Sequence, residues 1–239
     1  MASYDPTLKA PKCEHVHHSG SCTTQGTGLL NGKANSVEKY PPNTIDDCED
    51  GASGKYKQTE SIEAITITAS DAGTGGVLTA GAKARVTARV YTFEDGADDV
   101  ADFYYTSDLK SPVDWKLIGS KAAGAAGIVT ITSNEFVLPR AEVQAVRVNY
   151  RWTGGAHLAS PCSGGEYDDV DDLIYVVDTT GSIVPLETEL KPGPITTPQA
   201  LAATPVNCDE LDEDRCTAAL SCEWEVDSLF DLGECVVST

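Results

Sequence analysis

Residues 165–177, GEYDDVDDLIYVV, decide the fold of this chain. Asp168, Asp169, Asp171 and Asp172 directly precede the apolar run 173–177, whose length and β-branched content are typical of a buried strand. Ca²⁺ takes hard oxygen ligands that converge from several segments, and residues 46–51, DDCEDG, form a second acidic segment. The pattern therefore predicts a domain-closing strand with a calcium site at its mouth. The alternative is that the acids only form a solvated strand end.

Alternating apolar and polar residues predict further strands between residues 60 and 152. Ile65 and Ile67 share one face of residues 61–70, and the alanines and valines of residues 82–93 alternate with Arg85 and Arg89. Similar runs occupy residues 102–107, 114–119, 127–138 and 143–152, with turn-forming residues between them. Because no stretch has convincing helical periodicity, we expect an all-β fold, a β-sandwich spanning residues 45–178.

The segments on either side of this domain differ from it in composition. Residues 1–44 are rich in Gly, Pro, Ser, Thr and Asn and predict an irregular N-terminal arm. Residues 179–206 contain five prolines and predict an extended Pro/Thr-rich linker. Residues 207–239 hold four cysteines in a segment too short to bury a core of its own, so we expect a small module held by two disulfides.

The charge balance excludes some classes of partner. The chain has 17 Lys and Arg residues against 37 Asp and Glu, a formal net charge of −20. Binding to nucleic acid requires a basic surface, so neither nucleic acid nor an anionic membrane surface is an expected partner. No apolar stretch approaches the roughly 20 residues of a membrane-spanning helix, so no membrane insertion is expected. Residues 1–12 lack a signal-peptide core, and we expect a mature start or a piece of a longer secreted protein.

The eight cysteines predict a disulfide framework in an extracellular compartment, because their number is even and no CxxC pair occurs. We expect Cys13 to pair with Cys22, and Cys48 to meet Cys162 beside the acidic segments. The last four cysteines allow three connectivities, of which we favour Cys208 with Cys222 and Cys216 with Cys235. An alternative for the first pair is a zinc or copper site, because the cysteines enclose Glu14, His15, His17 and His18.

Six runs of this sequence, at residues 4–13, 26–32, 42–67, 103–119, 138–152 and 162–177, carry a resemblance to a known domain type. The signatures are NTIDxCxDGxSGxYxxxES, from residue 43, and YDDxDDL, from residue 167. They resemble a domain at the C-terminal ends of secreted proteases and other exported proteins of myxobacteria, and domains in large extracellular proteins of marine eukaryotes. The resemblance implies a secreted β-sandwich accessory domain.

YDDVDDL is also similar, more distantly, to the acidic C-terminal strand of jelly-roll carbohydrate-binding modules, in which an Asp helps to hold a structural calcium. This likeness implies a jelly-roll-like sandwich, Asp171 or Asp172 as a ligand, and further ligands from Asp50, a carbonyl near Lys55, and Glu60. With the acids of the two segments, the predicted calcium set is Asp47, Asp50, Glu60, Asp168 and Asp172.

Catalysis is not expected. The carboxylates stand in runs beside glycines, where solvent is expected, and His157 and Ser160 lack the surroundings of a nucleophile elbow. Binding is better supported, because Arg147, Asn149 and Arg151 alternate with apolar residues and are predicted to lie on an outer sheet face as a ligand-binding row. Trp115 and Trp152 could form a sugar platform, but their apolar faces favour the core.

The function predicted from sequence is a non-catalytic, calcium-stabilised extracellular binding or adhesion module that attaches to a polysaccharide or a surface protein. The alternative is a structural subunit of an extracellular filament or surface coat, in which the terminal arms self-assemble by clasping neighbouring copies.

Overall fold

The computed structural model describes residues 1–14, 20–70, 77–154, 158–162 and 164–180, together with the backbone of residues 222–227 and 232–237. The chain divides into two compact units, Met1–Glu187 and Thr188–Thr239, which are treated separately below. All regular elements of the described residues are β-strands, so the all-β prediction is confirmed. The described residues include no helix long and apolar enough to cross a membrane.

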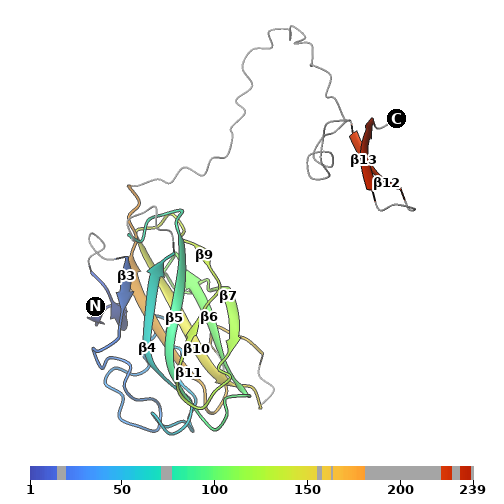
Figure 1. Cartoon of the computed structure of the whole chain (residues 1–239). Coiled ribbons are helices and arrows are strands. Elements are labelled where there is room, and N and C mark those ends of the chain that lie inside the picture. Colours follow the sequence, from blue (N-terminus) through green and yellow to red (C-terminus); the bar gives the residue numbers. More distant parts are fainter. Residues whose placement is uncertain are drawn as a thin grey trace. The chain divides into compact units, whose positions relative to one another are not determined.

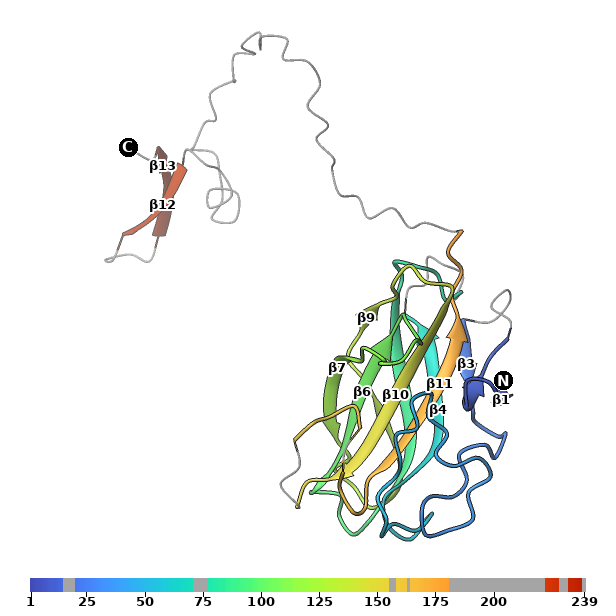
Figure 2. The same cartoon turned by 180° about the vertical axis from the view of Figure 1, so that it is seen from behind.

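The first unit is built from two sheets. The strands of the six-stranded sheet follow the order β1 (Ser3–Asp5), β2 (Ala10–Lys12), β11 (Asp169–Val176), β10 (Val143–Trp152), β6 (Asp99–Thr106) and β7 (Lys116–Ala122). The strands of the second sheet are β3 (Ser21–Thr23), β4 (Ser61–Ala69), β5 (Lys83–Thr92) and β8 (Gly127–Thr132), and β9 (Phe136–Val137) also pairs with β5. Figure 1 shows the β4–β5 sheet in front of the β10–β11 sheet, and Figure 2 shows the reverse.

The core lies between the two sheets and follows the alternation seen in the sequence. Val86 and Val90 of β5 face Val146 and Val148 of β10 across the sandwich core, and all four are fully buried. The predicted strands therefore form where expected, because side chains at every second position of a strand point to the same face.

The described residues of the N-terminal segment, 1–14 and 20–44, are largely irregular but do not form a separate arm. Strands β1 and β2 extend the first sheet next to β11, where Ile174 pairs with Lys12 in parallel, and β3 pairs with β4 in the second sheet. The Cys13–Cys22 disulfide, predicted from the sequence, joins these edge segments with a Cα–Cα distance of 5.9 Å. The N-terminal segment thus covers one open edge of each sheet, which protects the edge strands from pairing with other chains.

Strand β11 begins at Asp169, so the acidic residues lie within the strand or directly before it. Asp168, Asp169, Asp171 and Asp172 are each at most 1% exposed. The solvated strand end considered from the sequence is therefore wrong, because the strand continues through the acids and is covered on both faces.

The second unit is described only as an antiparallel hairpin of β12 (Cys222–Asp227) and β13 (Leu232–Val237), in which Trp224 pairs with Cys235. The predicted Cys208–Cys222 and Cys216–Cys235 disulfides, nearly all of the predicted linker and His15, His17 and His18 lie outside the described residues.

The Cys48–Cys162 disulfide, also confirmed, closes a much longer loop than Cys13–Cys22, since the sequence separations are 114 and 9 residues. In the chain-entropy account the longer loop stabilises more. We expect Cys48→Ala with Cys162→Ala to lower the free energy of unfolding by about 2 kcal/mol more than Cys13→Ala with Cys22→Ala does, as measured by urea denaturation. An equal or larger loss for the short loop would contradict this.

Candidate functional site

Strand β11 sends its acids to two different faces. Asp169 and Asp171 pair in register with Tyr150 and Val148, which belong to the core, so they point between the sheets. Asp172 pairs with Arg147 and points to the outer face. Successive side chains of a strand point to opposite faces, and this alternation divides the acids into two separate electrostatic environments.

On the outer face, Arg147 neutralises Asp172. Its Nε and Nη2 donate to the two carboxylate oxygens at 2.7 and 2.9 Å, and its Nη1 donates to the carbonyl of Pro161 at 3.1 Å. Arg147 also pairs with Asp46 and lies over the ring of Trp115, 4.3 Å from the ring centroid. Every ionised group here is therefore compensated by a charged partner, as a buried ion pair requires.

The ligand-binding row predicted on this face is not exposed. Arg147 and Asn149 are fully buried and Arg151 is 8% exposed. Asn149 donates to the carbonyl of Ser160 at 2.8 Å, and Arg151 pairs with Asp102. The prediction of an exposed row is wrong because loop residues 44–48 and 158–162 cover the outer face, which strand periodicity cannot reveal.

On the inner face, four carboxyl groups form a cluster: those of Asp169 and Asp171, which are buried, and those of Glu38 and Asp50, which are partly buried. Asp50 accepts a hydrogen bond from the backbone of Val170 at 3.0 Å and is within hydrogen-bonding reach of Asp169 and Glu38. Asp171 interacts electrostatically with the other three carboxyl groups. We call these four residues the acidic cluster.

Several oxygen atoms of the acidic cluster and its surroundings have no hydrogen-bond partner among the described residues. They are Glu38 Oε2, Asp169 Oδ1, both carboxylate oxygens of Asp171, and the side-chain oxygen of Asn43, whose Nδ2 donates to Glu38 Oε1. A buried polar atom without a partner costs about 1–3 kcal/mol, and more when the group is charged. Neutralising these oxygen atoms requires protons or a cation.

The pKa values of the cluster's carboxyl groups are raised, as expected where several carboxylates lie close together. Burial, with repulsion from Asp169, raises the pKa of Glu38 to about 7. Burial and the charge of Glu38 raise the pKa of Asp50 to about 7. Burial and neighbouring carboxylates hold the pKa values of Asp169 and Asp171 well above the usual range.

Lys33 is a buried cation whose charge acts on the acidic cluster. It is fully buried, and its Nζ donates to the backbone carbonyls of Glu60 and Tyr167 at 2.8 and 2.5 Å. Its charge lowers the pKa values of three cluster members, but it forms no ion pair with them. One ammonium cannot balance four carboxylates.

The unpaired oxygens are of the chemical type that calcium prefers, because this ion takes six to eight oxygen ligands from carboxylates, amide carbonyls and water. No three Asp, Glu, His or Cys side chains among the described residues already stand in a metal-ligating arrangement. An ion would therefore have to draw the carboxylates of the cluster inward.

The side chains of the predicted calcium set do not come together at one site. Asp47 is on the surface, where its Oδ1 accepts from Lys9 Nζ at 2.6 Å. Asp168 accepts from the backbone of Trp152 and Gly165 at 3.3 and 3.0 Å, and Asp172 is neutralised by Arg147.

The other two members of that predicted set are Asp50 and Glu60. Of the predicted residues only Asp50 belongs to the acidic cluster, since Glu60 pairs with Asp99 elsewhere. Glu38 was missed, whereas Asp169 and Asp171 were noted among the acids at the strand's start but were not included in the predicted set. Glu38 is a single acid in an irregular segment, which leaves no periodic signal, whereas the inward face of β11 did mark Asp169.

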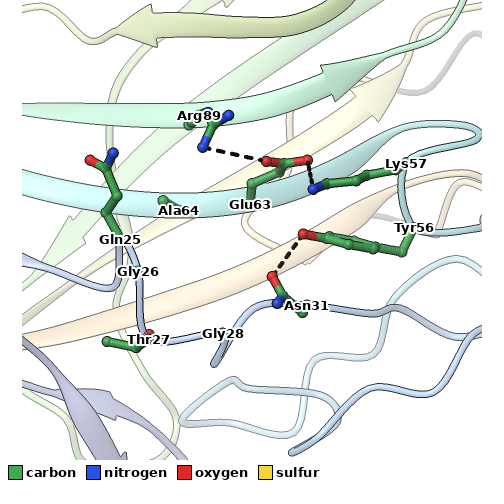
Figure 3. Close-up of a pocket in the computed structure, with 10 residues that line it drawn as sticks. All are labelled: Gln25, Gly26, Thr27, Gly28, Asn31, Tyr56, Lys57, Glu63, Ala64 and Arg89. Atoms are coloured by element: carbon green, nitrogen blue, oxygen red, sulfur yellow. Dashed lines mark hydrogen bonds and ion pairs between the residues drawn. The ribbon is translucent and has the colours of Figure 1, made fainter.

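An open polar pocket of about 410 Å³ lies against β4 and β5 (Figure 3). Glu63 stands at a β-bulge of β4, where its carboxylate forms ion pairs with Lys57 at 3.3 Å and Arg89 at 3.7 Å. The hydroxyl of Tyr56 donates to Asn31 Oδ1 at 2.7 Å. Because Oδ1 is the acceptor in this bond, the Nδ2 group of Asn31 is left as a donor. β-Bulges often aim side chains at binding sites.

Glu63 is unusually well fixed for a surface group. Its side chain is 4% exposed, while those of Lys57 and Arg89 are 50% and 45% exposed. Glu63 Oε1 is buried and accepts no well-aligned hydrogen bond from described residues. The pocket thus combines a held carboxylate acceptor with amide, guanidinium and ammonium donors and one aromatic ring.

Comparisons with protein-family models, with curated proteins and with solved structures find no match to this chain.

A second buried carboxyl pair, Glu60 and Asp99, predicts a pH dependence. Burial, then the charge of Glu60 and a hydrogen bond with it, raises the pKa of Asp99 to about 7. In the unfolded chain the pKa is near its usual ~3.9. The folded state therefore binds this proton more tightly, and the resulting stability is present below about pH 4 and lost as the pH rises through 7.

We expect Asp99→Asn to flatten the decline of unfolding free energy between pH 4 and pH 8, by at most ~1.4 kcal/mol per pH unit. Denaturant titrations at several pH values measure this. The control is Asp98→Asn, an exposed neighbour, which should leave the slope unchanged. An unchanged slope for Asp99→Asn would contradict the assignment.

Proposed function

We propose that this chain is a non-catalytic extracellular carbohydrate-binding module whose sandwich is closed by a calcium ion. The observation that carries the proposal is the polar pocket, because it offers both donors and acceptors on an open surface. Sugar hydroxyls donate and accept at once, so they match a carboxylate beside amide and guanidinium groups. The ring of Tyr56 supplies an apolar surface for a sugar face.

The extracellular setting is supported by the two disulfides, which persist in oxidising compartments. Binding to a polysaccharide is favoured over self-assembly as a structural subunit. That alternative requires free arms, whereas β1, β2 and β3 pair with strands of their own sandwich.

The calcium ion is supported by the acidic cluster and would be held by Glu38, Asp50, Asp169 and Asp171. When bound, the ion neutralises these carboxylates and joins β11 to the segments that carry Glu38 and Asp50. It would therefore stabilise the fold rather than contact the sugar.

The carbohydrate proposal can be tested on two arginines of the same strand. Arg89 and Arg85 lie four residues apart on β5, are 45% and 48% exposed, and each pairs with a glutamate, but only Arg89 lines the pocket. Retardation of the full chain in gels that contain xylan, laminarin or alginate should reveal at least one binding polymer. Arg89→Ala should weaken that binding about tenfold, equivalent to ~1.4 kcal/mol, and Arg85→Ala should not. Equal losses, or no retardation by any polymer in a broad panel, would overturn the proposal.

The calcium proposal predicts opposite effects of one substitution in two conditions. Calcium at a hundred times its dissociation constant adds about 2.7 kcal/mol, a melting shift of about 5–10 °C. Asp171→Asn removes a ligand and also a like charge, so it should melt below the native protein in calcium and above it in chelator. Scanning calorimetry measures both.

Asp47→Asn, which alters a surface acid, should keep the full response to calcium. A native melting temperature that does not change on chelation would contradict the site.

A further inference from the structure

A second pocket, of about 390 Å³, has a different chemistry from the polar pocket. Three aromatic residues line it: Phe93 follows β5, Trp152 ends β10, and Tyr167 precedes β11. The rings of Trp152 and Tyr167 meet edge to face, 5.7 Å apart at 88°. Phe93 is 48% exposed, so a large apolar ring is left at the opening. One exposed ring and two half-buried rings thus line the same cavity, and aromatic residues grouped in this way indicate a binding surface.

The charged residues that line this pocket are all acidic: Glu60, Glu94 and Asp98. Glu94 and Asp98 are exposed, whereas Glu60 is 4% exposed and its Oε2 has no hydrogen-bond partner among the described residues. A buried carboxylate oxygen in this state is costly and favours a ligand that donates a hydrogen bond. We call these residues, with the three rings, the aromatic–acidic pocket.

The combination of rings and carboxylates favours an organic cation. Aromatic faces carry negative partial charge and attract ammonium groups within about 6 Å of the ring. A sugar fits less well, because its hydroxyls need donors as well as acceptors and the charged groups here only accept. A bare metal ion fits less well too, because aromatic rings supply no oxygen ligand.

A primary ammonium on an alkyl chain meets all of these requirements. It offers three N–H donors to the exposed carboxylates of Glu94 and Asp98, and its methylene stem can lie against the rings. The net charge of −20 adds a long-range attraction for basic partners. We propose that the aromatic–acidic pocket binds the lysine side chain of a basic partner protein.

The test uses the full chain and a matched pair of short peptides. Acetyl-Gly-Lys-Gly-amide carries the ammonium, and the same peptide with norleucine has the alkyl chain without the charge. Titration calorimetry or the chemical shifts of Trp152 should show binding of the lysine peptide in the millimolar range and at least tenfold weaker binding of the norleucine peptide. Methyl glycosides and 1,5-diaminopentane are the competing ligands.

Variants at the rim identify the pocket without disturbing the core. Glu94→Gln and Phe93→Ala should each weaken binding of the lysine peptide at least threefold. Asp95→Asn changes an exposed acid of the same turn that does not line the pocket, and it should have no effect.

Three results would overturn the proposal. They are equal binding of the two peptides, binding of methyl glycosides in place of the lysine peptide, and tighter binding of 1,5-diaminopentane, which would assign the pocket to a free amine.

Discussion

The burial of four aspartates at one end of β11 is the constraint on which the rest of the structure depends. Moving an ionised carboxylate out of water costs several kcal/mol unless a partner compensates. The acids differ in their partners: Asp172 pairs with the guanidinium of Arg147, Asp168 accepts from backbone N–H groups, and Asp169 accepts from the backbone of Ile62 at 2.6 Å. Asp171 has no hydrogen-bond partner among the described residues, and burial with the neighbouring carboxylates raises its pKa. These interactions hold the loops that supply the partners in place against β11.

The acids of β11 thereby position the segments that carry both pockets. The backbone of Ile45 donates to Asp172 at 2.8 Å, and the backbone of Gly51 donates to the carbonyl of Asp168 at 2.8 Å. A Cβ on Gly51 would come within 2.2 Å of the carbonyl oxygen of Gly165, so only glycine permits this approach. The chain then continues to Tyr56 and Glu60, which line the polar and the aromatic–acidic pocket.

Strand positions could be predicted from the sequence because period-two alternation directly reports the face that is buried in the core. The Cys13–Cys22 and Cys48–Cys162 disulfides were also predictable. Cys13 and Cys22 lie close together in the sequence, and Cys48 and Cys162 each lie beside an acidic segment. The environment of Arg147 was not predictable, because alternation cannot show that loops cover the second face of a strand. Glu38 and Glu63 were missed for a related reason: one lies in an irregular segment and the other at a bulge, where periodicity fails.

The contacts of Lys33 explain why this residue does not form ion pairs with the acidic cluster. Its ammonium is bonded to the carbonyls of Glu60 and Tyr167, and Gly54 lies so close that a Cβ there would come within 2.2 Å of Nζ. The ammonium of Lys33 thus links the segments before β4 and β11 and is engaged there rather than with the carboxylates of the cluster. The raised pKa values allow protons to neutralise part of the cluster up to about neutral pH. The proposed divalent ion would supply positive charge without requiring the carboxylates to stay protonated. The exchange of protons for calcium would then couple the ionic composition of the surroundings to the stability of the loops that form both pockets.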